Sequence, residues 1–285
     1  MRTSPRERKT KVMLNKNIYF KELKHHRTSF IIWGLSFIVL ILLDMAFYPI
    51  LMKDDMIKQM SALFENPFMK GLMSAFGVSL DVLTNVLGYY AARNTMLILL
   101  LGGFFSILLA GKILSQEEHE KTAEFLLTKP VTRSEVVWSK LAAFFSLLLT
   151  LNIIILITGF ISLEIFKGDS EYSLAAFLIH TFYCFLLMLT FGAVGLFLSL
   201  WIKRGRPTTN LSIGIIIGGY FIDAASKITP SLDKIGYLSP FKFVDSSVLS
   251  PDYGLMWWRL LYFLGISLVL FTLTFLIYKK KDILV

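Results

Sequence analysis

Long apolar stretches recur along the chain, with polar segments between them. A helix rises 1.5 Å per residue, so about 20 apolar residues are enough to cross the hydrocarbon core of a membrane. Six stretches reach that length: residues 30–50, 93–114, 141–166, 174–202, 208–225 and 259–278. The pattern predicts an all-α polytopic membrane protein with six transmembrane helices.

The composition agrees with this prediction. Hydrophobic residues make up 55% of the 285 residues and charged residues 17%, whereas soluble domains carry about 25% charged residues. A single soluble core could not bury so much apolar surface. The one cysteine, Cys184, lies in an apolar run, so an intrachain disulfide is excluded and a small core thiol is favoured over a metal cluster.

Basic residues predict the orientation of the chain. Most of the Lys and Arg residues fall in four segments: 1–29, 112–140, 203–206 and 279–281. The alternate segments are longer and less basic, and cytoplasmic loops carry the excess of Lys and Arg. Both termini and the 115–140 loop are therefore predicted to be cytoplasmic. This topology, together with anionic membrane lipids, accounts for the net charge of +9 and removes the argument for nucleic acid as a partner.

Two segments flanking the spans have patterns of their own. In residues 1–29, Val12, Tyr19, Phe20 and Leu23 fall on one side of a helix, which predicts an amphipathic interfacial helix on the inner leaflet. A solvated basic tail is the alternative. Residues 279–285 are predicted to form a cytoplasmic tail.

Two further segments are predicted to lie outside the cell. In residues 51–92, apolar side chains recur at steps of four and three and predict one helical stripe that packs against the leaflet, other helices or a second copy. A ligand groove is the less favoured alternative, although methionine suits promiscuous surfaces. The stripe comprises Met69, Met73, Phe76, Leu80, Leu83 and Leu87. Prolines and aromatics in residues 226–258 predict interfacial or re-entrant helices.

A strongly charged stretch, residues 117–140, separates the second and third predicted spans. Within it, Thr132 and Glu135 fit a capping box, in which each side chain bonds the main-chain amide of the other residue. A short, well-capped cytoplasmic helix is predicted to start here.

Two common catalytic and nucleotide-binding motifs are missing from the sequence. Gly111-Lys112 would end a P-loop, but Ser106 stands at the first glycine position and Ile113 at the hydroxyl position. His119 has no second histidine one turn away, so the zinc motif H-E-x-x-H is absent. The chain is therefore not predicted to bind ATP through a P-loop or to hold a catalytic metal.

Four ionisable residues and two glycines inside the predicted spans are candidates for function. Charges in a membrane are costly and need partners. We expect Asp44 and Asp223 to pair across helices with Arg93 and Arg259 and to shape the outer part of a translocation route; snorkelling to the interface is the alternative. Gly214 and Gly218 form a G-x-x-x-G motif, which indicates either a dimer contact or intrachain helix packing.

The charged stretch also resembles the membrane subunits of ABC-2 type exporters. The similar residues are Thr122-Ala123-Glu124-Phe125-Leu126-Leu127, Pro130-Val131-Thr132-Arg133 and Lys140. Lys121 departs from the family, which usually has glycine there, and Thr132 replaces the commoner serine. In topology, the resemblance covers the whole chain.

The resemblance implies a specific arrangement of subunits. Residues 115–140 would provide a coupling helix for two separate cytoplasmic ABC ATPase subunits, which would bind ATP and magnesium. This chain would bind no cofactor, and it would pair with a second permease copy. The implied coupling residues are Glu124, Pro130, Val131, Thr132, Arg133, Glu135 and Lys140.

The implied function is export of an amphipathic substrate across a bacterial plasma membrane. The substrate would be an antimicrobial or cytolytic peptide, or a lipid-like molecule. Two alternatives belong to other classes: an intramembrane enzyme that uses Asp44 and Asp223 as its catalytic pair, and a membrane sensor or immunity scaffold that moves nothing.

Overall fold

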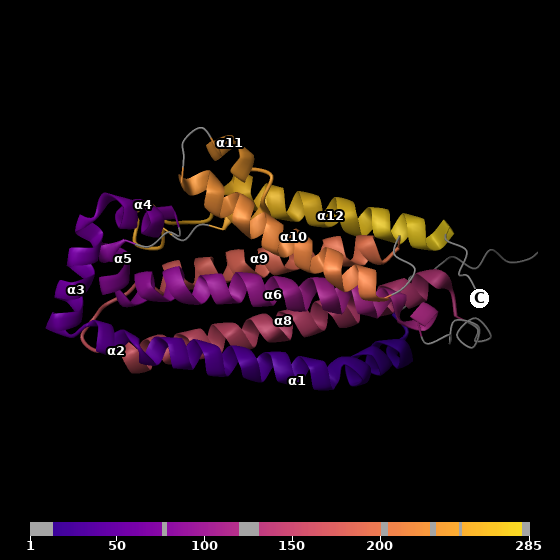
Figure 1. Cartoon of the computed structure of the whole chain (residues 1–285). Helices are drawn as coiled ribbons and strands as arrows, with labels where there is room; N and C mark the ends of the chain where they lie inside the picture. The colour runs from indigo at the N-terminus through magenta and orange to yellow at the C-terminus, as the bar shows by residue number, and fades with distance from the viewer. Residues whose placement is uncertain are drawn as a thin grey trace, which may run out of the picture.

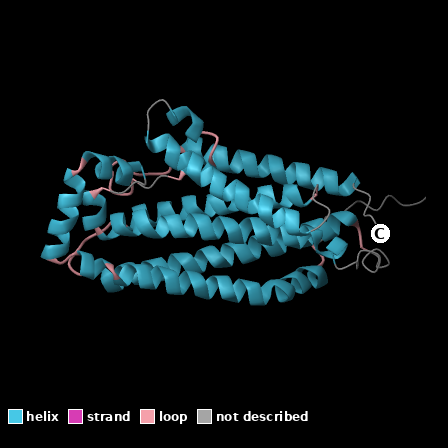
Figure 2. Ribbon diagram, viewed as in Figure 1, coloured by secondary structure: helices cyan, strands magenta, loops and turns pink. Residues whose placement is uncertain are grey.

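A computed structural model describes residues 14–75, 79–119, 131–200, 205–228, 232–244 and 247–280. Within these ranges, every regular element is helical (Figure 2). The elements are α1 (Lys16–Ala46), α2 (Tyr48–Leu51), α3 (Asp54–Glu65), α4 (Pro67–Ala75), α5 (Leu80–Thr84), α6 (Val86–His119), α8 (Arg133–Phe166), α9 (Leu174–Ser199), α10 (Gly205–Ile228), α11 (Asp233–Gly236), η2 (Pro240–Phe243) and α12 (Trp257–Lys280).

The long helices run alongside one another in an elongated bundle (Figure 1). The start of α1 and the end of α12 lie at the same end, which we call the terminal end. The short helices α2 to α5 cover the opposite end, which we call the capped end. The even number of long antiparallel helices places both ends of the described chain on one side of the bundle.

In the part of the chain that the structure describes, five helices are long and apolar enough to cross a membrane: α1 continued through α2, α6, α8, α9 and α12. The sixth predicted span coincides with α10, a helix of 24 residues that is not among these five. The all-helical membrane fold is therefore confirmed, while a sixth span at α10 stays a prediction.

The core lies around α6 and α9, which pack against each other more extensively than any other pair of helices. Small residues make this close approach possible. A side chain at Gly195 of α9 would clash with the main-chain carbonyl oxygen of Ile107 in α6. Around this centre, α1 packs against α8, α12 against α9, and α10 against α6.

Residues 16–29 do not form a separate interfacial helix, because they continue into the first predicted span as the single helix α1. The buried stripe of this segment is Ile18, Glu22 and His26, whereas Phe20 is exposed. The sequence pattern was misleading because a carboxylate, Glu22, faces the bundle. Residues 1–13 lie outside the described structure.

The apolar stripe of residues 69–87 does not follow one helix. Helix α4 ends at Ala75, and both Ser79 and Asn85 have extended backbones that divide the segment into α4, α5 and α6. The side chain of Asn85 accepts hydrogen bonds from the amides of Leu87 and Gly88 and so starts a new helix. The stripe is therefore shared between the capped end and the bundle core.

Between α10 and α12, the described residues form only the short elements α11 and η2, as the prolines of this segment predict. Aromatic rings pack closely here, and Phe243 stacks on Tyr262 of α12 with ring centroids 3.4 Å apart. Trp257 and Leu238 are strongly exposed. An interfacial or re-entrant position for this segment stays a prediction.

The contact at Gly195 gives a test of the α6–α9 packing. We expect Gly195→Ala to lower the free energy of unfolding by about 1–3 kcal/mol, because the added methyl forces the two backbones apart. Gly265→Ala in α12 is the matched control, since its added Cβ would meet nothing within 4 Å. Thermal unfolding in detergent measures both, and equal stabilities would contradict the packing.

Candidate functional site

The predicted capping box is present at the start of α8. The Thr132 Oγ1 accepts a hydrogen bond from the Glu135 amide at 3.2 Å, and a Glu135 carboxylate oxygen accepts one from the Thr132 amide at 2.8 Å. Thr132 is exposed, and the start of α8 contacts the start of α1 and the end of α12, which places it at the terminal end. A rigid helix start is thus presented on the surface. Glu124 and Pro130 lie outside the described residues, and Val131 directly precedes the cap.

Arg133 connects the start of α8 to the end of α12. Its Nη1 donates a hydrogen bond to the main-chain carbonyl of Lys279 at 3.4 Å. A displacement of the capped start of α8 would therefore also move the end of α12.

Lys140 lies in the interior of the bundle, although the resemblance implied a role for it on a docking surface. Its side chain is fully buried, and its Nζ donates to the main-chain carbonyl of Ile113 in α6. The same Nζ lies 3.7 Å from a carboxylate oxygen of Glu22 in α1, which is also fully buried. One ammonium group thus joins α1, α6 and α8.

Sequence reasoning missed Glu22 as a partner of Lys140. A second carboxylate oxygen of Glu22 lies 3.7 Å from His26 Nε2, one turn further along α1. The spacing of Ile18, Glu22 and His26 at steps of four places all three residues on one helical face. That signal could have shown that Glu22 shares a face with apolar Ile18, but not which residue it meets.

The beginning of α1 is fastened to the beginning of α8 by a short chain of hydrogen bonds. The Asn15 amide donates to Ser139 Oγ at 2.8 Å, and Ser139 Oγ donates to the Glu135 carbonyl at 2.7 Å. Asn15 is itself the N-cap of α1. One turn further in, the Tyr19 hydroxyl donates to Ser146 Oγ at 2.9 Å. The helix starts of α1 and α8 therefore form one unit.

The comparisons with known proteins agree with this architecture. The model of the family described as ABC-2 family transporter protein matches residues 16–283. The chain belongs to the ABC-2 transporter family. No curated protein matches it. Family membership makes the chain a multi-pass transporter membrane subunit rather than a catalytic enzyme.

In this ABC-2 protein, Asp44 of α1 forms the expected ion pair across helices. Arg93 of α6 donates from Nε and Nη2 to the same Asp44 oxygen at 3.0 and 2.9 Å. Asn94 donates to the other oxygen at 3.2 Å, and the Tyr89 hydroxyl donates to the Asp44 carbonyl at 3.1 Å. Both oxygens of the Asp44 carboxylate thus accept hydrogen bonds from side chains of α6. Its part in a translocation route stays a prediction.

Asp223 does not form the expected pair across helices. It pairs with Lys227, one turn further along α10, at 2.7 Å. The guanidinium of Arg259 instead lies 5.0 Å from the ring of Trp258 and 6.0 Å from that of Tyr183. Because Lys227 is on the same helix, the Asp223 carboxylate obtains a counter-charge without help from α12.

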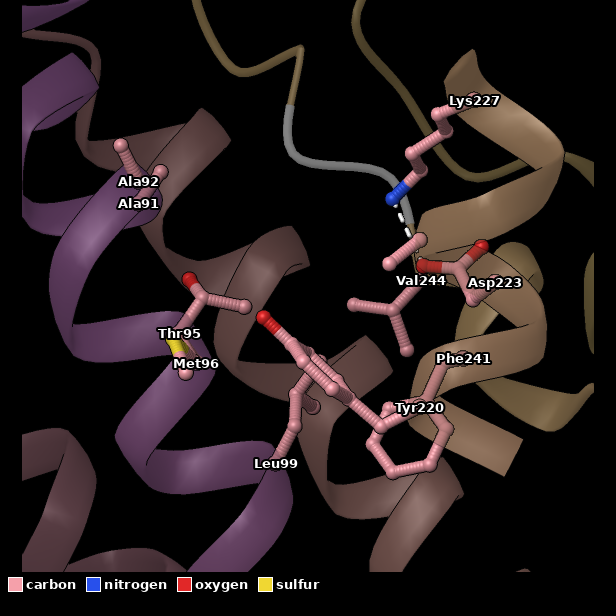
Figure 3. Close-up of a pocket in the computed structure, with 11 residues that line it drawn as sticks. Ala91, Ala92, Thr95, Met96, Leu99, Tyr220, Asp223, Lys227, Phe241 and Val244 are labelled. Carbon is pink, nitrogen blue, oxygen red and sulfur yellow. Dashed lines mark hydrogen bonds and ion pairs between the residues drawn. The ribbon is translucent and has the colours of Figure 1, made fainter. Parts of the chain in front are cut away.

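A small cavity of about 50 Å³ lies between α6 and α10 beside this pair (Figure 3). The Tyr220 hydroxyl points from α10 toward α6, where Thr95 lines the opposite wall. A cavity needs roughly 10–15 Å³ to hold one water, so this one holds a few waters at most. In this conformation it is too small for a substrate.

The intramembrane-enzyme alternative finds no support in this geometry. Asp44 and Asp223 lie on α1 and α10, which run along opposite sides of α6 (Figure 1). Each carboxylate has its own basic partner. Among the described residues, no group of three or more His, Cys, Asp or Glu is placed to hold a metal ion.

Gly214 and Gly218 lie on a face of α10 that no other described helix covers. A Cβ atom added at either position would meet nothing within 4 Å, and the neighbouring Ile217 and Phe221 are exposed. The two glycines therefore make no close intrachain helix contact, and a dimer contact at this motif stays a prediction.

The buried pair of Glu22 and Lys140 predicts a strong coupling in stability. Either Glu22→Leu or Lys140→Met alone should cost about 3–5 kcal/mol, because it leaves the opposite charge buried without this counter-charge. The double variant should cost less than the worse single variant. Unfolding in mixed detergent and dodecyl sulfate micelles measures the cycle, with exposed Lys24→Met as the control. Additive effects would contradict the pairing.

Proposed function

We propose that the chain is the permease subunit of an ATP-driven ABC exporter. The observation that carries the proposal is the capping box of α8, which stands on the surface at the terminal end of an ABC-2 protein. A transporter subunit without a P-loop needs an external source of ATP energy. The capped start of α8, with the preceding loop that includes Glu124 and Pro130, is proposed as the docking surface for cytoplasmic ABC ATPase subunits.

The contacts around this surface suit transmission of movement. The capping box makes the start of α8 rigid, and Ser139 and Lys140 lie one to two turns further into the same helix. Through them α8 is joined to α1 and α6, while Arg133 reaches α12. A push at Thr132 would thus tilt several helices together, as packed helices move in shear transitions.

The proposed partners follow from this role. Two ATPase subunits would bind ATP and magnesium, and this chain would bind neither. The basic terminal end would lie in the cytoplasm of a bacterial cell, beside anionic lipids of the plasma membrane.

A second permease copy is proposed to pack on α10. Its exposed Gly214 and Gly218 let another backbone approach closely, and van der Waals packing of this kind drives helix association in lipid. Exposed Ile217 and Phe221 border the motif and add apolar contact area.

The proposed substrate is an amphipathic peptide, either antimicrobial or cytolytic, or a lipid-like molecule. The route would pass the charges of the capped half of the bundle: Asp44 and Arg93 on one side, Asp223 and Arg259 on the other. Charges within a membrane protein commonly mark substrate pathways.

Docking of the ATPase can be tested at the helix cap. We expect Thr132→Ala combined with Arg133→Glu to reduce co-purification of a co-expressed cognate ABC ATPase about tenfold or more. The substitutions remove a cap that contributes about 1 kcal/mol and reverse a surface charge. Lys58→Glu, an exposed charge reversal on α3, is the matched control.

The same preparation separates export from the sensor or scaffold alternative. A permease should raise ATP hydrolysis when candidate peptides are added. A complex that assembles but never responds to any substrate would favour the scaffold. Normal assembly of the double variant would show that the cap is not the docking surface.

Association of two copies can be tested at the glycines of α10. We expect Gly214→Leu to lower the dimer fraction in liposomes several-fold, because its side chain prevents close backbone approach. Gly265→Leu places the same side chain on an open position of α12. Single-molecule photobleaching counts the copies. An unchanged dimer fraction in the Gly214→Leu variant would show that this motif is not part of the dimer interface.

A further inference from the structure

A second cavity, of about 200 Å³, lies at the capped end beneath α3 and α4. Its walls are apolar and rich in methionine, apart from one arginine: Leu51, Met60, Leu63, Phe64, Met69, Met73, Leu83 and Arg93. We call it the methionine pocket. Cavities of this apolar kind do not hold ordered water well and take up apolar molecules instead.

The helix that roofs the pocket is incompletely packed. Helix α3 is amphipathic, and a helix of this kind normally buries its apolar side. Yet none of its residues is buried; Met60 and Phe64 are only partly covered, and Leu63 is 55% exposed. The inner side of α3 faces the pocket rather than a filled core. An additional apolar group would complete this packing.

The size and lining of the pocket favour a slender, flexible occupant. Sites that enclose drug-sized ligands measure roughly 300–1,000 Å³, so this pocket is too small for a folded peptide or a bulky ring system. Methionine side chains are unbranched and polarizable and adapt to irregular apolar shapes. A single hydrocarbon chain fits both conditions.

Among the described residues that line the pocket, Arg93 supplies the only charge. Its side chain is 53% exposed, whereas its partner Asp44 is 9% exposed. Asp44 accepts hydrogen bonds from Nε and from one N–H of Nη2, and the Tyr89 hydroxyl is a further side-chain partner of the guanidinium. A guanidinium has five N–H donors in all. The ion pair therefore fixes the orientation of the guanidinium and leaves further donors directed away from Asp44. These donors suit a carboxylate, which arginine can bind through two parallel hydrogen bonds.

We propose that the methionine pocket binds a single-chain anionic amphiphile, such as a fatty acid, with its hydrocarbon chain between α3 and α4 and its carboxylate on Arg93. If the pocket is a substrate site, the proposal rests on the proposed export function and narrows the substrate class to anionic amphiphiles with a single chain. The binding itself does not depend on the ATPase. A binding experiment without the ATPase therefore fails or succeeds independently of the proposed function.

The test uses the full chain in phosphatidylcholine nanodiscs and a lauric acid analogue with a diazirine at its methyl end. After illumination, we expect adducts on the methionines and Phe64 of the pocket, located by peptide mass spectrometry. Met73→Trp fills the pocket and should lower this labelling about tenfold. Leu72→Trp, on the neighbouring outward position of α4, is the matched control and should change it less than about twofold.

Competition tests the role of the charge in the unmodified protein. Excess laurate should suppress the labelling, and dodecanol should be at least about fivefold less effective because it lacks the carboxylate. Arg93→Lys, which keeps a cation beside Asp44, should retain this preference, and Arg93→Gln should lose it.

Three results would overturn the proposal. Equal labelling of the Met73→Trp and Leu72→Trp variants would show that the ligand does not bind in the methionine pocket. Equal competition by dodecanol and laurate would show that Arg93 does not bind the carboxylate. Competition by phosphatidylglycerol or an amphipathic peptide, without competition by laurate, would assign the pocket to a different class of ligand.

Discussion

The ammonium group of Lys140 is the point on which the terminal end of this protein depends. It is buried among α1, α6 and α8, with the Glu22 carboxylate and the Ile113 carbonyl as partners. Removing one charge from such a site costs several kcal/mol, because the remaining charge stays out of water. The three helices can therefore separate only at a high cost, and they move most easily as one unit.

The position of this charge cluster connects stability with the proposed transport cycle. The exposed capping box of Thr132 and Glu135 lies at the surface, while Ser139 and Lys140 lie below it on the same helix. Force applied to the cap thus reaches α1 through Asn15 and Glu22 rather than through side-chain packing alone.

The capped end follows a different physical principle. There the charges mainly orient other groups: Asp44 of α1 holds the guanidinium of Arg93 of α6 at the wall of the methionine pocket, and Lys227 neutralises Asp223 within α10. Among the short helices of this end, α3 has no buried residue and packs loosely over the apolar methionine pocket. A rigid terminal end and an adaptable capped end would suit the proposed coupling of ATPase docking to ligand binding.

The sequence by itself determined the features that depend on near neighbours. Apolar length predicted the long helices, and the capping box of α8 was predicted because its two hydrogen bonds join residues three positions apart. Apart from the expected pair of Asp44 and Arg93, the tertiary structure decided which distant groups meet. Asn15 and Ser139 are 124 residues apart, and neither their contact nor that of Glu22 with Lys140 follows from periodicity, because it depends on α1 packing against α8. For the same reason, the predicted partner of Asp223 on another helix and the predicted single stripe along α4, α5 and α6 were wrong.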